Sequence, residues 1–161
     1  MFGGSHFSTS LLYKIQESLP KIKEDFIVFS YKLHGESYDN VTFMNFRDNF
    51  LDYLKASKGI ITQAGFQTFS ESVILKKPIL MFPIPNFLEQ EIISSWAEKK
   101  GIAIRESHKY LSEKDLLKIL KNFTESLPKM QRKLNKINIK SNGAQEAADI
   151  IESLVTKEKS K

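Results

Sequence analysis

The sequence predicts an α/β protein whose parallel sheet is covered by helices on both faces. Short apolar runs alternate along the chain with helical stretches, an alternation typical of β-α-β units. The runs are apolar at most positions rather than at every second one, as in DFIVFSY at 25–31. This pattern indicates strands that are buried on both faces. A length of 161 residues favours one domain with a hydrophobic core of its own.

The individual elements follow from local signals. Apolar residues at helical spacing predict a first helix over 8–19, which Pro20 ends. Lys76, Lys77 and Pro78 end a later helix, and Gly101 ends another. The predicted strands are 25–31, 41–43, 59–62, 79–82 and 102–104. The other predicted helices are 48–56, 67–75, 89–100, 112–123, 125–138 and 143–156, followed by a charged end at 157–161.

The positive charge is concentrated at the carboxyl end. Residues 129–161 hold eight Lys or Arg and four Asp or Glu, which is +4 of the total +5. We therefore expect a nearly neutral domain at 1–128, followed by basic helices and a tail at 129–161. A nucleic-acid-binding protein would carry basic and aromatic residues together on its folded body. Because that pattern is absent, no nucleic-acid partner is expected.

Other features limit the chemistry and the location. The chain has no cysteine, which excludes disulfides, thiol nucleophiles and cysteine-ligated zinc. The three histidines, His6, His34 and His108, form no ligand set, so no metal is expected. No apolar run approaches the roughly 20 residues of a membrane span. The amino end lacks the features of a signal peptide, so we expect a cytoplasmic protein.

Ligands of parallel α/β sheets bind beyond the carboxyl ends of the strands, in the loops that open the next helices. Three such loops stand out. The first, Gly3-Gly4-Ser5-His6, precedes the first helix. Its glycines would let a phosphate approach backbone N–H groups at the amino end of that helix. A turn without a ligand is the alternative.

The second loop follows the predicted strand at 59–62. Gly65 allows a positive φ or the close approach of a ligand. Gln67 and Thr68 would present N–H groups and a hydroxyl at the positive end of the helix. Glu71 lies one turn later, where its carboxylate can accept hydrogen bonds from a ribose diol. The alternative is a helix cap formed by Thr68 or Gln67, with Glu71 reaching back to it.

The third loop, at 83–86, leads to Glu89 and Gln90. An acid beside an amide supplies acceptors and donors that suit sugar hydroxyls. The alternative is that Glu89 and Glu91 only stabilise the amino end of their helix.

Taken together, AGFQTFSE at 64–71, KPILMFP at 77–83 and EQ at 89–90 resemble the donor-binding domain of GT-B glycosyltransferases, family 28 type. The resemblance covers about residues 1–105. It implies a Rossmann-like parallel sheet that forms the C-terminal half of a GT-B fold. It also implies a hexosyltransferase activity with a UDP-sugar as donor substrate and with no cofactor.

The resemblance gives each matching residue a role in binding a UDP-sugar. Glu71 would hold the ribose hydroxyls, and Glu89 and Gln90 would contact the donor sugar. Backbone N–H groups would reach the diphosphate from Gly65, Phe66, Gln67 and Thr68, with Gly3, Gly4 and Ser5 as the other wall.

The nucleotide base, most often uracil in this family, would lie against Phe46 and Arg47. The alternatives are a core position for Phe46 and a solvated helix start for Arg47.

The resemblance also implies a missing half. In GT-B enzymes the acceptor site and the usual catalytic base belong to an N-terminal domain, and this length has room for one domain. We therefore expect an N-terminal acceptor domain or a separate acceptor-binding subunit, and no activity from this domain alone. Only Met1 and Phe2 precede Gly3, so the first strand is expected to be truncated or supplied elsewhere.

The basic carboxyl-terminal region allows two interpretations. Lys129, Lys133, Lys136 and Lys140 follow helical spacing beside Met130, Leu134 and Ile137. An amphipathic basic helix of this kind suits peripheral contact with an anionic membrane. The alternative, which the sequence favours, is a helix that covers the domain and keeps its lysines in solvent.

The predicted function is the transfer of a sugar from a UDP-sugar to a lipid or glycan acceptor, with this chain binding the donor. Two alternatives stay open. One is a UDP-sugar 2-epimerase-like enzyme of the same fold, and the other is a non-catalytic module that binds a nucleotide or a partner.

Overall fold

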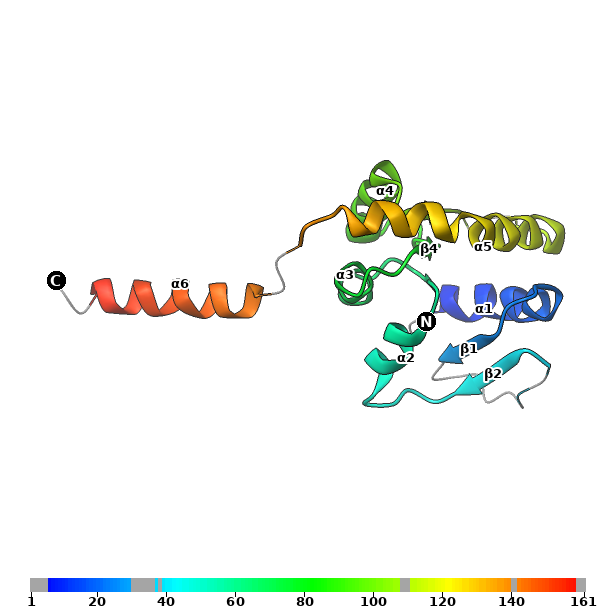
Figure 1. The fold of residues 1–161 in the computed structure, drawn as a ribbon, viewed down its shortest axis with the longest axis horizontal. Coiled ribbons are helices and arrows are strands. Elements are labelled where there is room, and N and C mark those ends of the chain that lie inside the picture. The colour runs from blue at the N-terminus through cyan, green and yellow to red at the C-terminus, as the bar shows by residue number, and fades with distance from the viewer. Residues whose placement is uncertain (1–5, 30–36, 38, 108–110, 140–141, 159–161) are drawn as a thin grey trace.

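The computed structural model describes residues 6–29, 37, 39–107, 111–139 and 142–158. Figure 1 shows strands and helices packed together in one body, from which the last helix projects. In the described residues the helices are α1 (His6–Ser18), α2 (Phe50–Ala56), α3 (Phe66–Ile74), α4 (Leu88–Lys100), α5 (Glu113–Asn135) and α6 (Gly143–Glu158). The strands are β1 (Phe26–Phe29), β2 (Val41–Met44), β3 (Ile60–Thr62), β4 (Ile79–Met81) and β5 (Ala103–Arg105). A short 3₁₀ turn, η1 (Leu19–Lys21), follows α1.

All strand pairs among the described residues are parallel, which confirms the predicted α/β class. They form two sheets, however, where one was expected. β1 pairs with β2 from Phe26 opposite Val41 to Phe29 opposite Met44. β4 lies between β3 and β5, with Ile79 opposite both Ile60 and Ala103. A cavity lined by residues of both β1 and β3 lies between the two sheets, and these two strands do not pair.

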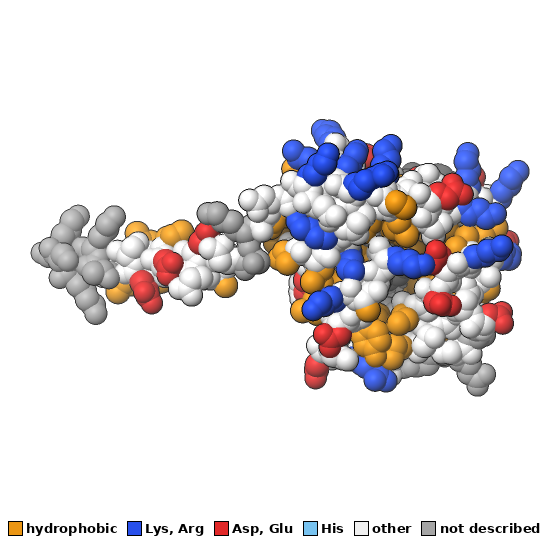
Figure 2. Space-filling view, in the orientation of Figure 1, with side chains coloured by type: hydrophobic (Ala, Val, Ile, Leu, Met, Phe, Trp, Pro, Cys, Tyr) orange, Lys and Arg blue, Asp and Glu red, His pale blue; other side chains and the backbone are white. Residues whose placement is uncertain are grey.

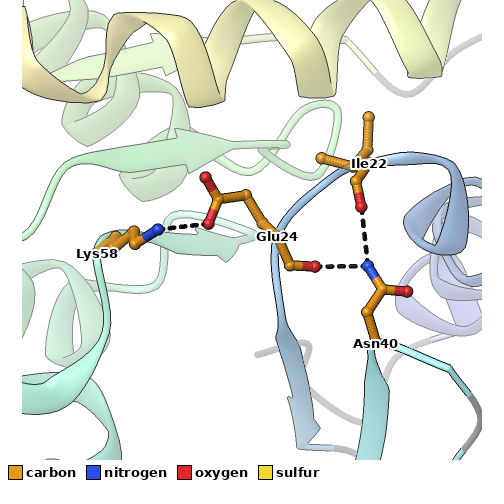
Figure 3. A network of polar contacts seen from close by, with 4 residues as sticks. All are labelled: Ile22, Glu24, Asn40 and Lys58. Atoms are coloured by element: carbon orange, nitrogen blue, oxygen red, sulfur yellow. Dashed lines mark hydrogen bonds and ion pairs between the residues drawn. The ribbon is translucent and has the colours of Figure 1, made fainter.

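A small polar network holds the segments that lead into β1 and β3 (Figure 3). Glu24 lies just before β1 and Lys58 just before β3, and their side chains form an ion pair at 2.7 Å. Asn40 donates to the carbonyls of Ile22 and Glu24. The network therefore links the amino ends of β1 and β3, although these strands do not pair.

Strand β4 shows why the apolar runs are uniform. Leu80 and Phe82 belong to a hydrophobic cluster on one face, together with residues of α1, β1 and α5. Ile79 and Met81 belong to a second cluster on the other face, together with residues of α2, α3 and α4. All four side chains are fully buried. Helices therefore cover both faces of the sheet, as the sequence predicts.

Helix α5 differs from its prediction. The sequence predicts two helices, 112–123 and 125–138, but a single helix runs from Glu113 to Asn135 with Pro128 inside it. Proline in a helix interior removes one hydrogen bond and is locally unfavourable. Tertiary packing outweighs this cost, because Phe123, Met130 and Leu134 are all buried on the same side of the helix.

The basic end of α5 covers the domain. Met130 and Leu134 are buried in the two core clusters. Lys129 and Lys133, which alternate with them, are exposed. Figure 2 shows Lys and Arg side chains gathered over the part of the molecule where α5 lies. The structure supports the domain-covering interpretation, because the apolar face that a membrane would need is packed against the core. None of the described helices is both long and apolar enough to cross a membrane.

A capping box begins α5 and gives a first testable prediction. The Ser112 hydroxyl accepts a hydrogen bond from the Asp115 N–H at 3.2 Å, and the Ser112 N–H donates to the Asp115 carboxylate at 3.1 Å. We expect Ser112→Ala to lower the free energy of unfolding by about 1 kcal/mol. Urea denaturation measures this, and Ser112→Asn, another good cap residue, should stay close to wild type.

The same cap should depend on pH. Hydrogen bonds from the Ser112 side chain and backbone lower the pKa of Asp115 below its usual 3.8. A lowered carboxyl pKa gives stability that is present above the unfolded value and is lost as the pH falls through the folded one. The difference in unfolding free energy between wild type and Ser112→Ala should therefore narrow in acid. A difference that stays constant down to pH 2 would contradict this assignment.

Candidate functional site

The candidate site lies where β3 ends and α3 begins. The positive φ expected at Gly65 occurs instead at Ala64, with φ of 70°, whereas Gly65 has φ of −62°. Ala64 is fully buried in the core, and this packing holds a conformation that is unfavourable for a residue with a side chain. A Cβ built on Gly65 would meet no atom within 4 Å. The fold therefore leaves open space at Gly65, which is consistent with the other expectation, close approach of a ligand.

The N-cap residue of α3 supplies no side-chain cap. This residue is Gly65, so the alternative in which Thr68 or Gln67 caps the helix is wrong. The first N–H groups of a helix have no partner within that helix, which makes this end favourable for anions. The Gln67 amide instead donates to the Glu71 carboxylate at 3.1 Å, one turn into the helix.

The sequence predicts that the Thr68 hydroxyl is presented at the amino end of α3, but the structure buries this residue. The residue is only 4% exposed, so this hydroxyl is not presented to solvent. Its carbonyl accepts a hydrogen bond from the Ser72 hydroxyl at 2.6 Å. A role for the Thr68 backbone N–H stays a prediction.

Glu89 brings two of the predicted loops together. Its carboxylate accepts a hydrogen bond from the Phe66 N–H at 3.3 Å, although the two residues are 23 positions apart. The carboxylate thus lies at the positive end of α3, in the region where an anionic group of a ligand is expected. A diphosphate bound at this end would compete with the Glu89 carboxylate for the Phe66 N–H.

The side-chain oxygen of Gln90 has a structural role. The residue is 8% exposed, and this oxygen accepts a hydrogen bond from the Ile84 N–H at 2.8 Å. This bond fixes the loop that carries Pro83 and Pro85. The Gln90 amide nitrogen takes no part in this bond.

Arg105 is a residue of this region that the sequence reasoning did not single out. It is the last residue of β5 and forms an ion pair with Glu91 of α4. The sequence offered a role in stabilising α4 as the alternative for Glu91. In the structure Glu91 also has a specific partner, Arg105. Next to it, partial burial and the nearby Glu98 raise the pKa of Glu106. The position of Arg105 directly after a predicted strand at 102–104 was the signal that could have found it.

The loop after β2 places Phe46 at the rim of an aromatic cluster. Its ring stacks on Phe50 at 5.3 Å between centroids and meets Phe29 edge-on at 6.2 Å. It keeps an exposed part, so it packs on the core and also reaches solvent. Arg47 is exposed, and its carbonyl accepts a hydrogen bond from the Phe50 N–H as α2 begins. Their roles at a nucleotide base stay predictions.

Some predicted positions lie outside the described residues. These are Gly3, Gly4 and Ser5 of the first loop, together with His34 and His108. Within the described part of the chain, His, Asp and Glu side chains form no group of three or more that could hold a metal ion.

A parallel α/β fold with polar residues gathered beyond β3 and β4 has the layout of a Rossmann-like ligand-binding domain. A model of the family described as glycosyl transferase family 1 matches residues 6–128, and the chain belongs to this family. An uncharacterized glycosyltransferase of Methanopyrus kandleri is 25% identical over 152 residues. These residues are 92% of this chain and 42% of that protein.

Solved structures share the fold. MurG of Acinetobacter baumannii superposes with a TM-score of 0.72 at 16% identity, over 94% of this chain and 48% of that one. UGT2 of Phytolacca americana, complexed with UDP-2-fluoro-glucose and pterostilbene, gives 0.73 at 17% identity, over 98% of this chain and 40% of that one. The resemblance to the C-terminal domain of GT-B glycosyltransferases is confirmed. The chain spans less than half the length of each of these proteins.

Proposed function

We propose that this chain is the donor-binding part of a glycosyltransferase that transfers a sugar from a UDP-sugar to a lipid or glycan acceptor. The observation that carries the proposal is the arrangement at the amino end of α3. There, Gly65 leaves open space and as N-cap supplies no side-chain cap, and the Glu71 carboxylate lies one turn further along.

Each part of this arrangement suits one part of a nucleotide sugar. N–H groups at a helix amino end, which have no partner within the helix, favour a diphosphate. A carboxylate can accept two hydrogen bonds from neighbouring hydroxyls, as a ribose offers. Glu89 lies beside this end, and Glu89 and Gln90 would contact the sugar. Two structural neighbours support a uracil nucleotide as the donor: UGT2 of Phytolacca americana is complexed with UDP-2-fluoro-glucose, and Os79 of rice is complexed with UDP.

The acceptor site and the catalytic base are proposed to lie on another domain or subunit. The chain spans 42% of its Methanopyrus relative, which leaves room for such a domain in a protein of that length. Binding of the donor to this chain and transfer of the sugar are therefore separate properties, and the first can be tested by itself.

Titration calorimetry of the purified chain with UDP, ADP and GDP tests donor binding. We expect UDP to bind at least about tenfold more tightly than either purine nucleotide, a difference of about 1.4 kcal/mol. A UDP-sugar should bind as well, with no product formed by the chain alone. Equal affinity for all three nucleotides, or no heat at millimolar UDP, would refute the proposal.

A further inference from the structure

Helix α4 carries apolar side chains on two sides. Toward the core it buries Ile93 and Ala97, as a helix that covers a sheet must. On its outer side Leu88, Ile92 and Trp96 are all exposed. Residues four positions apart follow one another along the surface of a helix, so these three side chains form a continuous apolar row. We call this row the α4 stripe.

Trp96, at one end of the α4 stripe, lies between the core and solvent. Its ring meets Phe69 of α3 edge-on at 5.9 Å between centroids, and the Lys100 ammonium lies 5.8 Å from its centroid. Tryptophan is enriched where one end of its side chain meets an apolar phase and the other meets water, above all at membrane interfaces. The surroundings of Trp96, apolar on one side and cationic on the other, have this character.

Positive charge gathers at the carboxyl end of the α4 stripe. Lys99 and Lys100 are exposed in the last turn of α4. A Cβ built on Gly101, the next residue, would collide with the Lys133 side chain, so the basic end of α5 lies against the end of α4. Lys129 of the same part of α5 is also exposed. Figure 2 shows Lys and Arg side chains over the part of the body where Figure 1 places α4 and the end of α5.

The acidic residues of α4 have other neighbours. Glu89 accepts its hydrogen bond from the backbone of α3, and Glu91 pairs with Arg105. Glu98 is close enough to Glu106 to raise the pKa of that carboxyl, together with partial burial. Both partners, Arg105 and Glu106, belong to the end of β5, so Glu91 and Glu98 are directed toward β5 rather than along the stripe. The stripe and its lysines therefore form a surface that is apolar and positive.

We propose that the α4 stripe lies on a lipid bilayer with anionic head groups. In this arrangement α4 is parallel to the bilayer surface, its apolar side chains enter the interface, and Lys99, Lys100 and Lys133 contact the head groups. Apolar burial and attraction to anionic lipids are the two terms that hold a helix in such a position.

Helix α6 presents the competing surface, and its charge argues against it. Ile150 and Ile151 are exposed there, so α6 has apolar side chains to offer as well. It holds four Asp or Glu and one Lys, however, and an anionic surface would repel it. Positive charge next to an apolar stripe is found at α4.

This inference rests on the proposed function and selects one of its two acceptor classes. Leu88 begins the α4 stripe, and the next residue, Glu89, is proposed to contact the donor sugar. A bilayer that covers the stripe would therefore bring the donor site to the membrane surface. A lipid acceptor could reach the sugar there without leaving the bilayer, which a free glycan acceptor would not require.

Tryptophan fluorescence gives a direct test, because Trp96 is the only tryptophan of the chain. The 161-residue chain is mixed with phosphatidylcholine vesicles that contain about 30% phosphatidylglycerol, or with phosphatidylcholine vesicles alone. With the anionic vesicles we expect co-flotation, a blue shift of the Trp96 emission and protection from acrylamide. Phosphatidylcholine alone should bind at least about tenfold more weakly. About 1 M salt should also weaken binding, since it shortens the Debye length to about 3 Å.

Two matched pairs of variants locate the contact. Ile92→Glu alters the α4 stripe, and its control Ile150→Glu makes the same change on α6 at a side chain with 61% exposure against 60%. Ile92→Glu should lower the partition coefficient at least about tenfold, whereas Ile150→Glu should not lower it. Lys99→Gln should weaken binding several-fold, and Lys121→Gln, an exposed lysine in the first half of α5, should not. Circular dichroism of each variant verifies its fold.

Three results would overturn the proposal: no flotation with anionic vesicles, flotation with no change at Trp96, or equal losses from Ile92→Glu and Ile150→Glu. A Trp96 shift that appears without vesicles as the protein concentration rises, and that Ile92→Glu removes, would assign the stripe to a second copy and also overturn it. Calorimetry with UDP is done without vesicles. UDP binding with no vesicle binding would thus refute the membrane contact alone, and the reverse result would refute the donor site.

Discussion

Replacing Glu71 with alanine should weaken UDP binding about 10- to 150-fold. A hydrogen bond to a charged group contributes about 1.5–3 kcal/mol, and the proposed function gives Glu71 the ribose hydroxyls. Its carboxylate accepts a hydrogen bond from the Gln67 amide at 3.1 Å, and a carboxylate has further acceptor positions that a ligand can use. Calorimetry with UDP measures the loss.

The fold should survive this substitution. A side-chain pair of the Gln67–Glu71 kind, four residues apart in a helix, contributes only a few tenths of a kcal/mol. Glu125→Ala is the matched control, because Glu125 is an exposed helical glutamate of α5. If Glu71→Ala binds UDP as tightly as Glu125→Ala does, the ribose role of Glu71 is wrong, whereas UDP binding by wild type would still support the donor site.

Much of the fold follows from local sequence signals. The run at 79–82 is apolar throughout because its residues contact a hydrophobic cluster on each face of the sheet. Gly101 ends α4 with φ of 68°, the left-handed conformation that favours glycine. Each of these signals lies within a few neighbouring residues, so the element that it marks can be predicted from the sequence.

The features that the sequence did not predict depend on distant contacts. α5 continues through Pro128 because Met130 and Leu134 are buried in hydrophobic clusters whose other members lie far away in the chain. The positive φ lies at Ala64 because the core packs around that side chain.

At the candidate site, the motifs AGFQTFSE and EQ predict which two loops carry the ligand-binding residues. They do not predict that the Glu89 carboxylate would meet the Phe66 N–H across 23 residues. The missing pairing of β1 with β3 is likewise a tertiary property. The apolar pattern of a sequence predicts where the strands are more readily than it predicts which strands pair with each other.

Phe82→Ala should lower the free energy of unfolding by about 3–5 kcal/mol, the usual cost of removing a buried phenylalanine. Phe82 follows β4, is fully buried and packs in the cluster shared by α1, β1 and α5. Its N–H also donates to the Thr62 carbonyl at 2.9 Å, so its backbone links the ends of β4 and β3. Alanine keeps this bond and leaves a cavity beneath the sheet.

Phe87→Ala is the matched control, since it is the same substitution five positions later at a side chain that is 47% exposed. Its effect on unfolding should be less than about 1 kcal/mol. Urea denaturation of both variants tests whether Phe82 is part of the core, and equal losses would contradict this. Domains of this kind are stable by about 5–15 kcal/mol, so a domain at the lower end of that range would lose most of its stability to Phe82→Ala. Saturating UDP should then restore part of the stability, because a ligand that binds only the folded chain shifts the equilibrium toward it.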